Sequence, residues 1–239
     1  MKKIFTFFGL ILLYQTSLAQ ELTANELLAK TIAYHDPHNN WPTFKGKLNV
    51  ISKTPEKLDR TTEIVISLAD ENFHARSTRD AETSNYIITK GKCIVSQIDS
   101  LRIANLIEKP KRSHCETTKR YSNYYLYLYG LPMKLKDPGT LIDPKLEKRS
   151  FKGVDYWVLK VTYDEEVGTD IWYFYFDLET YAMKVYQFFR NDTDGNLNKE
   201  SGEYILLSEE QTINGIKMPK TRAWYYNKDE KYLGTDILN

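Results

Sequence analysis

The segment His35-Asp36-Pro37-His38 places two imidazoles and one carboxylate within four residues. Imidazole and carboxylate groups are ligand types that zinc sites use. However, Pro37 interrupts helical structure at this point, and no third histidine lies nearby in the sequence. A polar loop between a helix and a strand explains the segment as well. We therefore predict no metal site and keep a metal-dependent protein using His35, Asp36 and His38 as the less favoured alternative.

Residues 192–196 (Asp-Thr-Asp-Gly-Asn) are similar to the beginning of a calcium-binding loop. A third acid at the right spacing is missing, and Glu200 precedes the position of the closing glutamate, so a loose hairpin turn is the better interpretation. The sequence also contains no GxSxG, HExxH, P-loop or GxGxxG motif. We therefore predict that the protein is not an enzyme and uses no cofactor.

Cys93 and Cys115 are the two cysteines of the chain. Their spacing fits neither a zinc site nor a CxxC redox motif. In an oxidising compartment the even number favours a disulfide, which would contribute about 3 kcal/mol in the chain-entropy model. Two buried, unpaired thiols are the alternative, and the sequence leaves both open.

The beginning of the chain predicts an export signal. Lys2 and Lys3 precede an apolar run at residues 4–14, and Ser17-Leu18-Ala19 supplies the small residues of a cleavage site. As a helix the apolar run would span about 16 Å, roughly half of a bilayer's hydrocarbon core, which argues against a retained membrane anchor.

Cleavage after Ala19 would leave Gln20 as the first residue, where a bacterial lipoprotein carries cysteine. We therefore expect residues 1–19 to be a signal peptide and residues 20–239 to form a single domain. The mature chain is expected to be periplasmic or secreted, with no lipid anchor and no transmembrane segment.

Composition limits the class of protein. The 239 residues are 41% hydrophobic and 27% charged, a mixture typical of a globular domain and unlike that of a disordered tail. Lys and Arg number 33 against 32 Asp and Glu, which argues against nucleic acid as a partner because such proteins usually carry a concentrated basic face.

Two helices and many strands are expected after the signal. Thr23 and Glu26 form a capping box for a helix that ends near Tyr34, and a second helix runs over about residues 117–129. Residues 134–143 are expected to form an ordered loop. Short turns join the strands, so neighbours must be antiparallel. The expected strands are 44–51, 61–68, 72–77, 86–89, 93–97, 147–151, 155–163, 170–176, 181–190, 203–208, 220–226 and 232–237.

The turn at residues 177–180 allows the two faces of the C-terminal sheet to be assigned. A four-residue turn pairs Phe176 with Tyr181, Phe174 with Met183, and Trp172 with Val185. These side chains, with Phe189, would share the more apolar face. The opposite face would carry Ile171, Tyr173, Tyr175, Ala182, Lys184, Tyr186 and Phe188.

A row of aromatic side chains on one face of a sheet is usually core. The functional interpretation is that the sheet curves and leaves part of this face open as a groove for an apolar ligand. The ligand-binding residues predicted on this basis are Trp157, Leu159, Val161, Trp172, Phe174, Phe176, Met183 and Val185.

As an ordered set, several motifs resemble the outer-membrane lipoprotein carrier superfamily, which includes LolA, LolB and the LppX-type proteins. The stretches that carry the resemblance are Leu27-Leu28 with residues 41–48, Tyr173-Phe174-Tyr175-Phe176-Asp177-Leu178-Glu179-Thr180 with Met183-Lys184, and Ile213-Asn214-Gly215-Ile216-Lys217-Met218-Pro219. Residues 34–37 and 131–139 look more closely like an uncharacterised family of exported envelope proteins with that fold.

The resemblance implies a mostly β (α+β) fold: a strongly curved antiparallel sheet, or incomplete β-barrel, whose concave face is covered by two helices. It also implies a mobile lid held by a buried arginine, which the sequence does not place. We therefore expect a non-catalytic protein that binds or carries a lipid or the acyl chain of a lipoprotein. A structural or protein-interaction module with a filled core is the alternative, and the sequence does not indicate an oligomeric state.

Overall fold

The computed structural model describes residues 22–97, 99, 103, 112–194 and 196–239. The predicted signal peptide, residues 1–19, lies outside the described residues. Its removal and the single-domain organisation of the rest therefore stay predictions.

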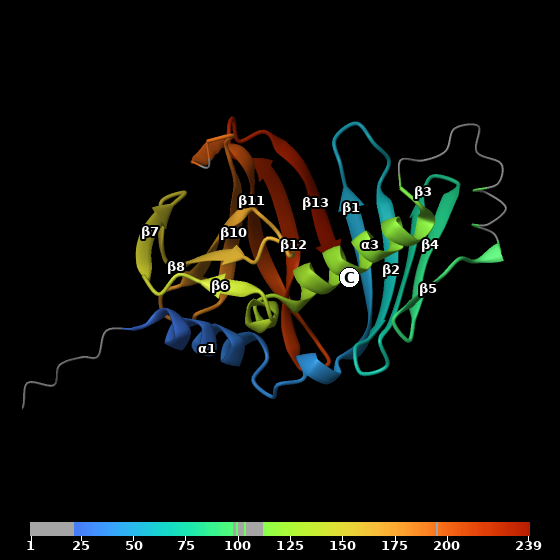
Figure 1. Ribbon diagram of the computed structural model, residues 1–239, viewed down its shortest axis with the longest axis horizontal. Helices are drawn as coiled ribbons and strands as arrows, with labels where there is room; N and C mark the ends of the chain where they lie inside the picture. The colour runs from blue at the N-terminus through green and yellow to red at the C-terminus, as the bar shows by residue number, and fades with distance from the viewer. Residues whose placement is uncertain (1–21, 98, 100–102, 104–111, 195) are drawn as a thin grey trace, which may run out of the picture.

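A 13-stranded antiparallel sheet forms the body of the structure (Figure 1). The strands follow the order β5-β4-β3-β2-β1-β13-β12-β11-β10-β9-β8-β6, and β7 pairs with β8 outside this path. The edges β5 and β6 do not pair with each other, so the curved sheet stays open. The strands are β1 (Lys45–Lys53), β2 (Arg60–Ser67), β3 (Asn72–Arg79), β4 (Glu82–Thr89), β5 (Lys92–Ile94), β6 (Thr140–Ile142), β7 (Glu147–Phe151), β8 (Val154–Tyr163), β9 (Ile171–Asp177), β10 (Met183–Asn191), β11 (Leu197–Ile213), β12 (Ile216–Tyr226) and β13 (Tyr232–Leu238).

Two α-helices with described bounds pack on this sheet, at the places that the sequence predicted. The first, α1 (Ala24–His35), begins at the predicted capping box of Thr23 and Glu26. The second, α3 (His114–Gly130), begins at a capping box that the sequence analysis missed, and it runs across the concave face of the sheet in Figure 1. Short 3-10 helices follow each of them, η1 (Trp41–Thr43) and η2 (Met133–Lys136). No helix among the described residues is long and apolar enough to cross a membrane.

The expected fold class is confirmed, and the largest differences from the expected strands lie in β6 and β11. The segment 134–143 was expected to be a loop, but β6 forms within it by pairing with β8. The strand β11 is also much longer than the expected 203–208, because its beginning pairs with β10 and its end continues to pair with β12 beyond Glu209. Glu209 adopts a positive φ of 53° and interrupts this pairing, which explains why sequence alternation alone did not reveal one continuous strand.

The predicted pairing across residues 177–180 is wrong. The backbone N–H of Asp177 donates to Ala182, and Tyr181 has a positive φ of 62°, so Tyr181 belongs to the turn and not to the strand. Phe176 therefore pairs with Met183. An irregularity between Met183 and Val185 then shifts the register of β10 against β9 by one more residue.

This shift exchanges the faces of the second half of β10. Phe174 lies opposite Tyr186, and Trp172 lies opposite Phe188, so these two β10 rings face the concave core and not the opposite face. Val185 was predicted in the concave set, and this assignment is wrong because it packs on the other side of the sheet. The same pairing placed Phe189 on the concave face. Phe189 instead packs on the convex side, beside the cluster that contains Val185.

The convex side of this region carries a second apolar cluster. Its buried members are Val158, Tyr173, Tyr175 and Val185, and Phe151 of β7 packs against them. The Phe151 ring lies 5.2 Å from the ring of Tyr175, centroid to centroid. Tyr173 lies on the face opposite Phe174, as predicted, and it is buried there because β7 pairs with β8 and brings Phe151 onto this cluster.

Candidate functional site

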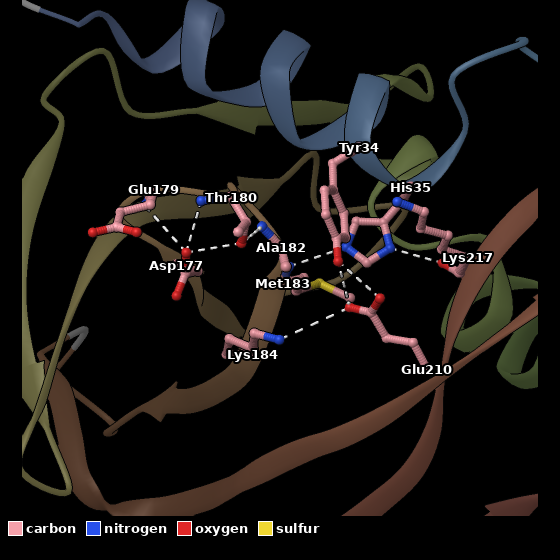
Figure 2. Close-up of polar contacts among 10 residues, drawn as sticks. All are labelled: Tyr34, His35, Asp177, Glu179, Thr180, Ala182, Met183, Lys184, Glu210 and Lys217. Atoms are coloured by element: carbon pink, nitrogen blue, oxygen red, sulfur yellow. Dashed lines mark hydrogen bonds and ion pairs between the residues drawn. The ribbon is translucent and has the colours of Figure 1, made fainter.

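The buried histidine His35 joins the end of α1 to two strands of the sheet (Figure 2). Its Nε2 accepts a hydrogen bond of 3.0 Å from the backbone N–H of Met183, so Nδ1 carries the proton and donates 2.7 Å to the carbonyl of Lys217. Burial lowers the pKa of His35, which favours this neutral imidazole. Both ring nitrogens are thus occupied by backbone groups.

The neighbouring residues complete a structural contact and not a metal site. The carboxylate of Asp36 is buried and accepts hydrogen bonds from the backbone N–H groups of Asn40 and Trp41, at 2.7 and 2.8 Å. His38 is exposed to solvent. The described residues contain no group of three or more His, Cys, Asp and Glu side chains that could hold a metal ion. The geometry therefore gives no support to the metal-dependent alternative.

A polar cluster next to His35 anchors the same end of α1 (Figure 2). The hydroxyl of Tyr34 lies 3.0 and 2.8 Å from the two carboxylate oxygens of Glu210, and the ammonium of Lys217 lies 4.0 Å from the centre of the Tyr34 ring. Lys184 lies 3.8 Å from Glu210. Burial and the Glu210 carboxylate raise the pKa of Tyr34 to about 12, so the phenol stays protonated. These contacts hold α1 on β10, β11 and β12.

A large open space lies under α3, at the end of the sheet formed by β3, β4 and β5. This first cavity measures about 670 Å³ and has mainly apolar walls. A disulfide between Cys93 of β5 and Cys115 of α3 forms part of its wall. The lining residues are Ser67, Leu68, Glu71, Asn72, Phe73, Ile88, Gly91, Cys93, Ser113, Cys115, Glu116, Lys119, Ser122, Asn123 and Leu126.

A second cavity of about 400 Å³ shares Asn123 and Leu126 with the first. It lies between α3 and the strands β6, β8 and β9. Tyr127 and Tyr163 hydrogen-bond to each other at its wall, and burial raises the pKa of Tyr163 to about 12. The remaining lining residues are Lys134, Asp137, Pro138, Thr140, Val167, Gly168, Asp170 and Trp172. The two cavities therefore meet at Leu126 and together follow one side of α3.

Comparison with protein families identifies the chain. A family model described as a family of unknown function, DUF6503, matches residues 2–238. The chain belongs to the DUF6503 family. No curated protein matches the sequence.

Solved structures place this DUF6503 protein in a known fold. It is similar to the crystal structure of a LolA superfamily protein from Nitrosomonas europaea, with 13% sequence identity over 91% of each chain and a TM-score of 0.53. A DUF1329 family protein from Desulfovibrio piger ATCC 29098 is 11% identical over 90% of each chain, with a TM-score of 0.46. The expected LolA-like fold is confirmed.

The DUF6503 structure places the eight predicted ligand-binding residues in four different surroundings. Trp172 lines the second cavity. Trp157 is partly buried, and Val185 lies on the convex side. The other five are fully packed in the main core: Leu159, Val161, Phe174, Phe176 and Met183. Their role as a binding set stays a prediction, and the open space lies instead along α3.

One fully buried residue, Arg222 of β12, was not predicted from the sequence. Its guanidinium donates to the carbonyls of Pro219 and Leu128, each at 3.1 Å, and lies 4.2 Å from the centre of the Tyr129 ring. The Leu128 carbonyl would normally accept from the residue four positions on, but that residue is Pro132, which has no N–H. Arg222 therefore supplies the donor that the end of α3 lacks.

Alternation along β12 could have indicated this arginine. Ile216 and Met218 are buried on the concave side, and Arg222 lies four residues beyond Met218, at the same parity. A charged residue on the buried face of a strand indicates either that a buried group binds its charge or that this end of the strand is exposed. No comparable signal exists for the cavities, because their walls come from segments far apart in the sequence.

Proposed function

We propose that this protein binds a lipid or an acyl chain, without catalysis, in the two cavities that meet at Leu126 under α3. The observation that carries the proposal is the open, largely apolar space of about 670 Å³ under a helix that crosses a curved sheet. Ligand sites typically measure about 300–1,000 Å³ and combine apolar walls with a few polar groups. Both cavities fall within this range.

Hydrocarbon chemistry fits these walls. Leu68, Phe73, Ile88 and Leu126 present apolar surface to the first cavity, and its rim carries Lys119 and acidic residues. Each methylene transferred from water to such a surface contributes about 0.8 kcal/mol before the cost of association is subtracted. An acyl chain along α3 would therefore gain affinity from length, while the rim would remain in contact with solvent.

The helix α3 is the proposed cover of this site. Arg222 holds its C-terminal end on β12, and the disulfide of Cys93 and Cys115 holds its N-terminal end on β5. The buried arginine implied by the LolA resemblance thus has a candidate in Arg222. Entry of a long chain would require the middle of α3, around Leu126, to shift while the two ends stay attached.

Filling the junction of the cavities tests the proposal. Leu126→Trp places a larger side chain where the cavities meet, so we expect it to reduce or abolish the stoichiometric binding of a fluorescent fatty acid. The control is Leu58→Trp, because Leu58 is 64% exposed and lines neither cavity. Undiminished binding by a folded Leu126→Trp protein would place the ligand elsewhere.

The alternative is an envelope module with a filled core. It is favoured by one observation: five of the eight residues first predicted to bind a ligand are fully packed in the core. Under this alternative the wild-type protein binds no fatty acid at a defined stoichiometry. Export to the periplasm or the medium is part of the proposal and depends on the predicted signal at residues 1–19, so the secreted protein should begin at Gln20.

A further inference from the structure

A third cavity lies on the other side of α3 from the two apolar ones. It measures about 320 Å³, and its lining residues are Arg60, Arg120, Tyr121, Tyr124 and Tyr125. An α-helix turns about 100° per residue, so the α3 residues of this cavity lie roughly opposite those that line the first one. The third cavity is therefore a separate site, and an inference about it does not depend on the proposed lipid binding.

Arg60 reaches this cavity from the concave face of the sheet. It precedes the buried residues Thr62 and Ile64 at intervals of two along β2, so the three side chains share a face. One terminal nitrogen of Arg60 donates to the hydroxyl of Ser52 at 3.2 Å. Its Nε is buried and has no hydrogen-bond partner. A buried N–H donor without an acceptor is costly, which shows that the protein itself does not satisfy all the donors of Arg60.

The surrounding charges make the site basic. Arg79 lies directly opposite Arg60 across β2 and β3, and its Nε is also buried without a partner. Glu82 is the cross-strand neighbour of Arg79 on the other side. Within the part of the chain that the structure describes, none of Arg60, Arg79 and Arg120 forms an ion pair with an acid. Like charges placed directly opposite each other are destabilising unless something neutralises them.

Two acids line an adjoining cavity of about 160 Å³, which shares Arg60 and Tyr124 with the third cavity. Asp236 accepts a hydrogen bond of 3.4 Å from the Tyr124 hydroxyl, and Glu203 and Lys53 also line that space. The acids are therefore beside the basic site, and the five residues that form the third cavity include no acid.

We propose that the third cavity binds a phosphate group, carried either by a soluble phosphate ester or by a lipid head group. Guanidinium groups bind phosphate oxygens through paired, charge-assisted hydrogen bonds, which Arg60 and Arg120 would supply from two sides of this cavity. The phenol rings of α3 would line the part of the ligand that carries the phosphate. Arg60 would bind the phosphate from the sheet, and Arg120 would bind it from α3.

Titration with inorganic phosphate at low ionic strength tests the site, and co-sedimentation with phosphatidylglycerol vesicles, against phosphatidylcholine vesicles, tests the lipid source. The variants are Arg120→Gln, which changes an exposed side chain, and Arg60→Met. The control is Arg76→Gln, because Arg76 is exposed and lies on the opposite face of β3. We expect Arg120→Gln to weaken phosphate binding by about tenfold or more, the loss of one charge-assisted contact. Arg76→Gln should leave it unchanged.

The possible outcomes distinguish a soluble phosphate ester from a lipid head group, and one set of outcomes would overturn the proposal. Saturable binding of inorganic phosphate that is lost in the two site variants supports a soluble ester. Binding only to phosphatidylglycerol vesicles, lost in the same variants, supports a lipid head group. Equal effects of all three substitutions, or no saturable binding of either probe, would overturn the proposal. If Arg60→Met does not fold, the result for Arg120→Gln alone tests the phosphate site. Fatty-acid binding by the folded variants should equal that of the wild type, because the third cavity is separate from the two apolar ones.

Discussion

Replacing His35 with leucine tests how α1 is held on the sheet. The substitution removes the hydrogen bonds to the N–H of Met183 and to the carbonyl of Lys217 and leaves both backbone groups buried without a partner. Each such group costs about 1–3 kcal/mol, so the free energy of unfolding should fall by about 2–6 kcal/mol. This is a large part of the roughly 5–15 kcal/mol that stabilises a typical domain.

The control is His38→Leu, three residues away. His38 is exposed, so its replacement should change stability by no more than about 0.5 kcal/mol. Urea unfolding followed by tryptophan fluorescence measures both variants. Equal midpoints for His35→Leu and His38→Leu would refute the role assigned to His35.

Acidification adds a second, independent measurement on the same residue. Burial holds the pKa of His35 below its ordinary value, so the unfolded chain takes up a proton at a higher pH than the folded one. The contribution of His35 is thus complete above about pH 6.5 and is lost as the pH falls below it. Wild type should lose more stability than His35→Leu between about pH 7.5 and about pH 5.5. Identical pH dependence in the two proteins would contradict the buried neutral imidazole.

Three further substitutions test contacts around α3. Replacing both Cys93 and Cys115 with serine should lower the free energy of unfolding by about 3 kcal/mol, because the bond closes a separation of 22 residues; urea unfolding with and without reductant measures it. Arg222→Met should cost about 1–3 kcal/mol and speed hydrogen exchange at the end of α3, because buried carbonyls lose their donor. Gly130→Ala should destabilise the protein, because a Cβ there would lie 2.3 Å from the Trp41 ring, and calorimetry would show a lower Tm.

Local signals in the sequence predicted the elements well. The capping box of Thr23 and Glu26 fixes the beginning of α1, and the turn around Asn214 and Gly215 separates β11 from β12. Both depend on residues close together in the chain. The resemblance to the LolA superfamily then supplied the curvature of the sheet, which short motifs do not contain.

The register of β10 and the positions of the cavities could not be predicted from such local signals. The faces of β10 depend on Tyr181, whose left-handed backbone a non-glycine residue rarely adopts, and on the irregularity before Val185. One such residue exchanges the two faces of a strand. The cavities depend on how far α3 stands from β3 and β4, and this distance is set by packing over many residues. Alternation along β12 could have indicated that Arg222 is buried, but not its partner at Leu128, which lies far away in the chain.

The central claim is that an acyl chain lies along α3, at Leu126. A fatty acid carrying a photoreactive group at the end of its chain tests this directly, because irradiation bonds the ligand to the residues that it contacts. The account predicts one label per protein, mapped by peptide mass spectrometry to α3 and to the strands carrying Phe73 and Ile88, and displaced by unlabelled fatty acid. No displaceable label, or a label confined to exposed residues outside the two cavities, would contradict it.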